Sequence, residues 1–162
     1  MFDTIIIGGG ASGLATAVML KKINADLKVA VVEQFDRVGK KISVTGNGRC
    51  NISNTDIKKS NYHSNDLNKA FEILKDFDLQ KTAEFFSSIG VELTFEGNKA
   101  YPRSFQASSV VDALRFAATN LKVDIIAGTT VQKVTKSNNS FILKTNNNTL
   151  TAKTVIIATG GL

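Results

Sequence analysis

Three glycines with the spacing Gly8-x-Gly10-x-x-Gly13 constrain this chain most, because they stand between a strand-like run and a helical pattern. Residues 4–7 are β-branched and predict a buried strand, and apolar residues recur at helical spacing after the glycines. In such a unit Gly8 permits the turn, Gly10 lets the backbone approach a pyrophosphate, and Gly13 lets the helix pack on the strand. The spacing predicts a dinucleotide site at the helix start, where free amides and the helix dipole favour phosphate.

A carboxylate after the next apolar run strengthens this interpretation. Residues 29–32 predict a second strand, which ends at Glu33, 20 residues beyond Gly13. Residues 4–33 thus predict a βαβ unit with parallel strands and a right-handed crossover. Glu33 can accept hydrogen bonds from both ribose hydroxyls, and its charge would repel a 2′-phosphate. The glycines alone would also suit a plain strand-to-helix turn; with Glu33 in place, we expect dinucleotide binding.

The composition is that of one globular domain. The chain has 162 residues, of which 43% are hydrophobic and 21% charged, and its net charge is +6. Its apolar runs fall short of the roughly 20 residues of a membrane-spanning helix, and no basic leader precedes the first strand. A single cysteine, Cys50, cannot form an intramolecular disulfide, and a single histidine, His63, cannot build a metal site alone. We therefore expect a cytoplasmic protein that holds no metal and no membrane anchor.

The remaining patterns predict an α/β fold of Rossmann-like type, with a parallel sheet, helices and a three-stranded antiparallel β-meander. Residues 35–66 have no sustained period, which is typical of a long loop that is either functional or disordered. The later elements that we expect are helices at 67–77 and 79–89, a hairpin of 93–96 and 99–101, a helix capped by Ser108 or Ser109 and reaching 121, a parallel strand at 123–126, meander strands at 129–135, 140–145 and 149–151, and a buried strand at 154–158.

The segment 37–51 is the most informative part of the long loop. It places two glycines around Asn47 and continues with an Arg-Cys-Asn string. Bare glycine backbone permits close approach of a ligand, and the polar groups suit the rim of a heterocycle. A solvated basic turn would account for Lys40 and Lys41 but not for residues 45–51. An extended cofactor such as FAD needs a loop of this kind beyond its pyrophosphate.

Four strings in the chain resemble the aminoacetone oxidase-like family of FAD-binding flavoproteins. They are residues 8–14 (GGGASGL), 39–54 (GKKISVTGNGRCNISN), 101–104 (YPRS) with the helix that follows, and 155–162 (VIIATGGL). The resemblance covers the chain from end to end, and the string TGNGRCN is far more specific than the glycine fingerprint. It implies a flavoprotein of the two-dinucleotide-binding-domain type with FAD as its cofactor.

The resemblance also implies which residues contact FAD. Glu33 would bind the adenosine ribose, Val131 would contact the adenine, and residues 45–51 would reach the flavin. The expected cofactor-binding residues are Gly8, Gly10, Ala11, Ser12, Gly13, Glu33, Gln34, Lys41, Thr45, Gly46, Asn47, Gly48, Arg49, Cys50, Asn51, Val131, Ala158, Thr159 and Gly160.

Members of this family continue past the strand that ends this sequence. We therefore expect residues 1–162 to be the N-terminal part of an FAD-binding domain, without the substrate domain and the C-terminal FAD-binding segment, and inactive by itself. The expected parts are a βαβ unit at 4–33, a cofactor loop at 37–54, a helical insertion at 67–121, and the meander with the final strand at 123–162.

The implied activity is an oxidoreduction in which FAD carries hydride between a nicotinamide donor or oxygen and a small organic substrate. Small amino ketones and unsaturated ring compounds such as bile acids are the substrate classes that the resemblance suggests. The catalytic residues are not identified by the sequence.

Two other classes of function compete with the oxidoreductase. The net charge of +6 suits an RNA-modifying or nucleic-acid-associated flavoprotein, but the basic residues are scattered and no aromatic stacking surface is visible, so we expect no nucleic-acid partner. A dinucleotide-binding module without turnover is the other class, and reduction of bound flavin by a nicotinamide donor would distinguish it.

Beside Arg49, Cys50 could be a thiol of lowered pKa, yet a small buried residue is the simpler interpretation. We expect His63 to be a solvated loop residue.

Overall fold

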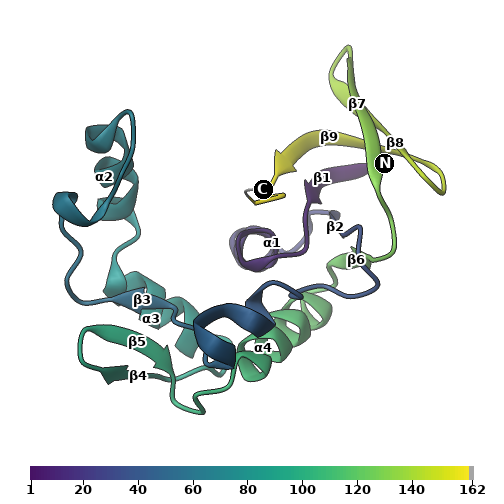
Figure 1. The fold of residues 1–162 in the computed structure, drawn as a ribbon. Helices are drawn as coiled ribbons and strands as arrows, with labels where there is room; N and C mark the ends of the chain where they lie inside the picture. The colour runs from purple at the N-terminus through teal and green to yellow at the C-terminus, as the bar shows by residue number, and fades with distance from the viewer. Residues whose placement is uncertain (161–162) are drawn as a thin grey trace. The chain divides into compact units, whose positions relative to one another are not determined.

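The computed structural model describes residues 1–160, which divide into two compact units. The first unit comprises Met1–Ser43 and the chain from Val111 onward, and the second is Val44–Val110. Figure 1 shows the ribbon of the chain, coloured from the N-terminus to the C-terminus. Each unit has a sheet of its own.

The first unit is built on a mixed sheet of six strands in the order β6-β2-β1-β9-β8-β7 (Figure 1). Strands β6, β2, β1 and β9 run parallel, and β9, β8 and β7 form an antiparallel meander. This arrangement confirms the predicted Rossmann-like fold with its meander. The strands are β1 (Phe2–Ile7), β2 (Val29–Val32), β6 (Asp124–Ile126), β7 (Val131–Ser137), β8 (Ser140–Thr145) and β9 (Thr149–Ile157).

One prediction about this sheet is wrong: the third meander strand and the final buried strand are a single strand, β9. Ala152 pairs with Phe141 of β8 on one side and with Phe2 of β1 on the other. The run TLTAKTVII contains no glycine, proline or asparagine that could end a strand, so it stays extended. The meander is therefore continuous with the parallel sheet.

The core of the first unit explains why the βαβ pattern folds as it does. Helix α1 (Ala11–Ile23) packs on β1 and β2 and buries Leu14, Ala17 and Val18 completely. All four residues of β2 are buried, as expected for a strand that lies inside a parallel sheet. A further buried cluster joins the parallel strands to the meander, and its members are Ile5, Ala30, Val32, Leu143 and Ala152.

The second unit holds a three-stranded antiparallel sheet in the order β3-β5-β4 and two helices. Asp66 and Asp78 cap the helices by accepting hydrogen bonds from the N–H groups of Lys69 and Lys81. The predicted hairpin and both predicted helices are confirmed to within two residues. The elements are β3 (Ser53–Asn54), α2 (Leu67–Asp76), α3 (Leu79–Ser87), β4 (Leu93–Glu96), β5 (Lys99–Pro102) and the short 3₁₀ turn η2 (Lys59–Asn61). The segment η1 (Ile42–Gly48) begins in the first unit and consists of two short turns separated by a kink at Thr45, Gly46 and Asn47.

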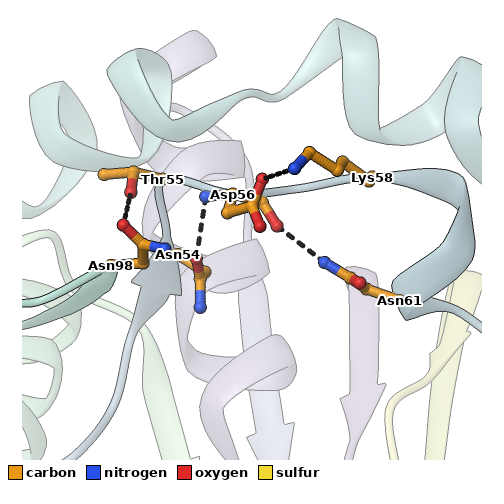
Figure 2. A network of polar contacts seen from close by, with 6 residues as sticks. All are labelled: Asn54, Thr55, Asp56, Lys58, Asn61 and Asn98. Atoms are coloured by element: carbon orange, nitrogen blue, oxygen red, sulfur yellow. Dashed lines mark hydrogen bonds and ion pairs between the residues drawn. The ribbon is translucent and has the colours of Figure 1, made fainter.

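Polar contacts order the part of the predicted loop that follows β3. Figure 2 shows that Thr55 contacts Asn98 at the tip of the β4–β5 hairpin, and that Lys58 and Asn61 both contact Asp56. The N–H of Thr55 also donates to the carbonyl of Asn98 (2.8 Å), and the N–H of Asp56 donates to the Asn54 side chain (2.8 Å). Thr55 thus joins this part of the irregular segment to the hairpin, and the other contacts lie within residues 54–61.

Helix α4 (Ala107–Asn120) runs from the second unit into the first and begins earlier than predicted. Neither Ser108 nor Ser109 caps it. The hydroxyl of Ser109 donates to the carbonyl of Gln106 (2.8 Å), which places Ser109 inside the first turn. The hydroxyl of Ser104 accepts a hydrogen bond from the N–H of Gln106 (3.2 Å), so the chain turns into the helix before the predicted caps. No helix within residues 1–160 is long and apolar enough to cross a membrane.

Candidate dinucleotide site

The structure gives a different reason for glycine at each of the three fingerprint positions. A Cβ on Gly8, which has φ +111°, would overlap the carbonyl oxygen of Ala158, and one on Gly13 would overlap the carbonyl oxygen of Gly8. The fold itself therefore requires glycine at both positions. At Gly10, by contrast, a Cβ would meet no described atom within 4 Å. The open space above Gly10 fits the predicted approach of a ligand to the backbone.

Helix α1 begins directly beside this space. Gly10 is its N-cap residue, no side chain among the described residues caps it, and its first turn carries no acidic residue. The first amides of a helix have no partner inside the helix, and the helix dipole places about half a positive charge at this end. Ala11, Ser12 and Gly13 thus present donors that suit an anionic group.

Glu33 lies where the sequence predicts it, at the end of β2 and next to the glycine loop. Its side chain is nearly buried, and Oε2 accepts a hydrogen bond from the N–H of Gly9 (2.7 Å). Oε1 accepts from the N–H of Phe35 (3.0 Å). A carboxylate has about four acceptor positions, so two remain for ribose hydroxyls.

Gly9 is a residue that the sequence reasoning missed. Its N–H is held by Glu33, its carbonyl accepts from the N–H of Gly39 (2.8 Å), and a Cβ on it would lie 2.5 Å from Cγ1 of Val38. Gly9 thus links the carboxylate after β2 to the beginning of the segment 39–54. The run of three consecutive glycines was the available signal, because the fingerprint itself leaves the middle position open.

The loop before β7 lies against the turn that follows β2. The N–H of Thr129 donates to the carbonyl of Glu33 (2.9 Å), and the N–H of Gly128 donates to the carbonyl of Phe35 (2.7 Å). Val131 follows this loop and is half-buried, so the predicted adenine position lies two residues from a direct contact with Glu33. Phe35 was not predicted; its ring is 38% exposed, and the Lys40 ammonium lies 4.5 Å from the ring centroid.

The end of β9 meets the glycine loop from the other side. The N–H of Ala158 donates to the carbonyl of Ile7 (2.8 Å), and the position of a Cβ on Gly8 touches both Ala158 and Thr159. Nζ of Lys41 lies 3.9 Å from where a Cβ on Gly160 would be. The first unit therefore brings together the predicted residues of the glycine loop, Glu33, Lys41 and the β9 end.

The predicted flavin-side residues, 45–51, belong to the second unit. Gly46, Asn47 and Gly48 have φ of +55°, +55° and +79°, so three consecutive residues adopt the left-handed conformation. A Cβ on Gly46 would lie 2.8 Å from the backbone nitrogen of Asn51, whereas one on Gly48 would meet no described atom within 4 Å. Packing within the loop accounts for Gly46, and open space is left at Gly48.

Arg49 holds this loop to β5. Its guanidinium lies 4.4 Å from the ring centroid of Tyr101 and 4.8 Å from that of Phe105. It also forms an ion pair with Glu96 (2.8 Å). Because the ion pair is exposed, we expect the cation–π contacts with the two aromatic rings to contribute more to stability than the ion pair does. The Arg49 side chain is thus engaged within the second unit.

Cys50 is buried, and burial raises the pKa of its thiol. This direction is opposite to the one expected of a thiol activated by Arg49, and it agrees with the interpretation of Cys50 as a small buried residue. A hydrogen bond with Thr45 opposes the shift in pKa without reversing it. His63 is exposed in a loop, as predicted.

Comparison with known sequences gives this site its context. Residues 2–162 match the HI0933-like protein Rossmann domain. The chain belongs to the HI0933-like family. The narrower resemblance to aminoacetone oxidase-like proteins is not established by the comparisons.

Relatives of this HI0933-like chain are much longer. It is 40% identical over 156 residues to the 3-dehydro-bile acid delta(4,6)-reductase of Clostridium scindens, covering 96% of this chain and 38% of that protein. It is 27% identical over 167 residues to the ribosomal RNA dihydrouridine synthase of Haemophilus influenzae, covering 99% of this chain and 40% of that protein. The chain thus spans about two fifths of the length of these two relatives.

Solved structures share the fold at low sequence identity. The Thermovibrio ammonificans THI4 structure has a TM-score of 0.62 at 17% identity, covering 98% of this chain and 57% of that one. The T. acidophilum thioredoxin reductase has a TM-score of 0.54 at 22% identity, covering 98% and 35%. At these identities the likeness shows the fold.

The family and its oxidoreductase relatives point to FAD as the cofactor of this HI0933-like domain. The residues of the first unit fit the adenosine diphosphate half of such a group. Gly10 leaves room at the backbone, α1 presents uncapped amides among the described residues, and Glu33 keeps acceptors for ribose.

Proposed function

We propose that this chain is the FAD-binding part of a flavin-dependent oxidoreductase. When bound, the flavin would supply hydride transfer between a nicotinamide donor or oxygen and a small organic substrate. The observation that carries the proposal is the buried Glu33 carboxylate, which is hydrogen-bonded to the glycine loop beside the open space at Gly10. The protein's part in the reaction is then to bind and orient the cofactor.

Glu33 selects the adenosine ribose in this proposal. Both carboxylate oxygens already accept backbone N–H groups, so the side chain is held rigid before a ligand arrives. The remaining lone pairs accept the 2′- and 3′-hydroxyls, while a 2′-phosphate is repelled. The site therefore favours FAD over a cofactor phosphorylated on this ribose. In this proposal Gln34, which follows Glu33, and Val131, the first residue of β7, contact the adenosine.

The diphosphate lies over Gly10 and the first amides of α1. Ala11, Ser12 and Gly13 donate to its oxygens, and no described acidic side chain in the first turn opposes its charge. Lys41, whose ammonium lies near Gly160, adds positive charge at the edge formed by the β9 end. Ala158, Thr159 and Gly160 complete this edge.

Residues 45–51 serve the flavin. Support comes from the left-handed run that ends at Gly48, where open space would let a flat ring approach the backbone. The residues are Thr45, Gly46, Asn47, Gly48, Arg49, Cys50 and Asn51. Within this set Arg49 fixes the loop to the aromatic residues Tyr101 and Phe105.

The substrate class follows from the relatives. The 40% identity to a 3-dehydro-bile acid reductase favours an unsaturated ring compound, and the aminoacetone oxidase-like resemblance favours a small amino ketone as the second candidate. The match to a ribosomal RNA dihydrouridine synthase supplies a third class, a base within RNA. NAD(P)H is the electron donor that we propose for reduction.

We propose further that residues 1–162 form the N-terminal part of the FAD-binding domain, and that the rest of a full-length protein supplies the substrate domain and a closing FAD-binding segment. The chain's share of its relatives, 38% and 40% of their lengths, supports this division. The 162 residues alone are then expected to bind FAD weakly and to lack turnover.

A spectrum of the purified full-length protein tests the proposal directly. Flavin absorption in the visible, with FAD and not FMN released on denaturation, is the expected result. Anaerobic addition of NADH or NADPH should bleach these bands, and a substrate panel of the three classes identifies the acceptor. A protein that purifies without flavin and shows no heat of binding with added FAD would refute the proposal.

A further inference from the structure

The last quarter of this chain carries four of its six net positive charges, because acidic residues are absent there. Residues 125–162 contain four lysines and no aspartate or glutamate, whereas all 14 acidic residues lie in residues 1–124. The four lysines are on the meander, and they are Lys133 and Lys136 of β7, Lys144 of β8 and Lys153 of β9. The meander is therefore a cationic element with no acidic residue of its own.

Two of these lysines are direct cross-strand partners. Lys133 of β7 lies opposite Lys144 of β8, so both side chains project from one face of the sheet, and both are exposed. Opposed residues in an antiparallel pair have Cβ atoms about 5 Å apart, and like charges in this position destabilise the sheet. The described ion pairs leave both lysines without an acidic partner, whereas Lys153 is paired with Asp3 (2.7 Å).

Protection of the sheet edge does not account for this pair. Lysines on an edge strand prevent unwanted strand pairing, which is a sufficient reason for Lys133 and Lys136 on the edge strand β7. Lys144, however, is on β8, which is hydrogen-bonded to β7 on one side and β9 on the other. A charge on this interior strand, directly opposite another of the same sign, needs a different reason.

We propose that the face of β7, β8 and β9 that carries Lys133 and Lys144 binds the sugar-phosphate backbone of a nucleic acid. A polyanion would convert the repulsion between the two ammonium groups into binding energy. Threonines 135, 149 and 151 share this face by register and can donate hydrogen bonds to phosphate oxygens. The inference does not depend on the proposed flavin chemistry.

The other side chains of this face favour a nucleic acid over a membrane as the ligand. They also favour contacts with the nucleic-acid backbone over contacts with the bases. Ile142 is the one large apolar residue among its described positions, so the face offers little to insert into a bilayer. No aromatic residue lies on these positions, so bases have no stacking partner. Binding is therefore to the backbone and independent of sequence. The sequence-based expectation of scattered basic residues missed this pair because strand register brings its members together.

The test compares binding of a short labelled RNA duplex, and of a DNA duplex of the same sequence, to the full-length protein by fluorescence anisotropy over a range of KCl concentrations. The variant is the double substitution Lys133→Gln with Lys144→Gln. The control is Lys136→Gln, which removes one charge from the other face of the same strand, and its charge-matched comparison is with the single substitution Lys133→Gln. Flavin content and thermal unfolding are measured on every sample.

We expect the double variant to bind on the order of tenfold more weakly at low salt, with the slope of log Kd against log salt reduced by up to about 1.8 for two lost phosphate contacts. Lys136→Gln should bind like the wild type. Equal affinity for both duplexes identifies the shared backbone as the ligand, and preference for the RNA duplex adds recognition of its shape. If the double variant unfolds, the same binding measurement is made on the single substitutions Lys133→Gln and Lys144→Gln.

Three results would overturn the proposal. The first is wild-type affinity in the double variant, and the second is a loss in Lys136→Gln equal to that in Lys133→Gln, which would show that net charge alone matters. The third is binding to phosphatidylserine vesicles that depends on Lys133 and Lys144 while neither duplex binds, which would assign the face to a membrane surface. Because flavin content is read separately, a protein without flavin would refute the proposed oxidoreductase and leave this comparison intact.

Discussion

Replacing Glu33 with alanine separates two roles of one carboxylate. In the free protein the substitution removes the acceptors of the Gly9 and Phe35 N–H groups, and the contact with Gly9 is buried. A buried donor left without a partner costs about 1–3 kcal/mol. We therefore expect the free energy of unfolding of the apoprotein to fall by about this amount, even with no ligand present.

The effect on FAD binding adds to this loss of stability. Removing charge-assisted hydrogen bonds to the ribose costs about 1.5–3 kcal/mol, which corresponds to a Kd raised about 10- to 150-fold. Glu33→Gln should behave similarly, because an amide has one oxygen to accept with and its NH₂ group would face one of the two backbone N–H donors. Loss of order in the glycine loop would make the effect on Kd larger, since Gly9 also bonds to Gly39.

The assay is urea denaturation of the apoprotein together with calorimetric titration of FAD into the full-length protein. Asp112→Ala is the control, because Asp112 makes an exposed ion pair with Arg115 that is worth at most a few tenths of a kcal/mol. Unchanged apoprotein stability in Glu33→Ala would refute the role of the carboxylate in holding the glycine loop. Unchanged Kd would refute the ribose contact, whatever the stability.

Three further predictions follow from single positions. Gly10→Val should abolish FAD binding and lower the apoprotein's free energy of unfolding by about 1 kcal/mol, because valine is a poorer N-cap residue than glycine but meets no described atom. Gly13→Ala should destabilise the fold more, because its Cβ would overlap the backbone. Denaturation and FAD titration of both variants check this, and a flavin-loaded Gly10→Val protein would contradict it. Burial raises the pKa of Cys50, so iodoacetamide should alkylate it more slowly in the native than in the urea-unfolded protein, and faster native alkylation would disprove the assignment. Lys144→Thr should raise the free energy of unfolding by about 0.2–1 kcal/mol at low salt and by less at high salt; a loss of stability would count against repulsion from Lys133.

Local sequence was sufficient to predict most of the strands and helices and to place the glycine loop and Glu33 beside each other. The β-branched run before Gly8, the helical spacing after Gly13 and the strand ending in Glu33 each depend on neighbours in the chain, so their patterns could be read directly. The hairpin over Gly97 and Asn98 was predictable for the same reason. These features predicted the Rossmann-like unit, which is confirmed, and a set of ligand-binding residues, which stays a prediction.

Predictions that depended on where an element ends were less successful. Strand β9 was divided in two because its first half alternates like a meander strand and its second half is apolar like a buried one. Both halves pair with neighbours that the sequence does not reveal, β8 on one side and β1 on the other. Helix α4 begins at Ala107, after a turn in which the hydroxyl of Ser104 accepts a hydrogen bond from the N–H of Gln106, and the sequence pattern did not reveal this turn.

What the sequence determined by itself is the succession of strand, glycine turn, helix and strand in residues 4–33, because the periodicity of nearby residues and the conformational freedom of glycine are local properties. Only the tertiary structure shows that a Cβ on Gly8 would overlap Ala158. Only the tertiary structure decided that Glu33 holds Gly9, that Arg49 stacks on Tyr101 and Phe105, and that Lys133 faces Lys144. Each of these contacts joins residues more than ten positions apart. Their partners are chosen by the register of strands and the packing of loops, which depend on the free energy of the whole fold and not on any local pattern.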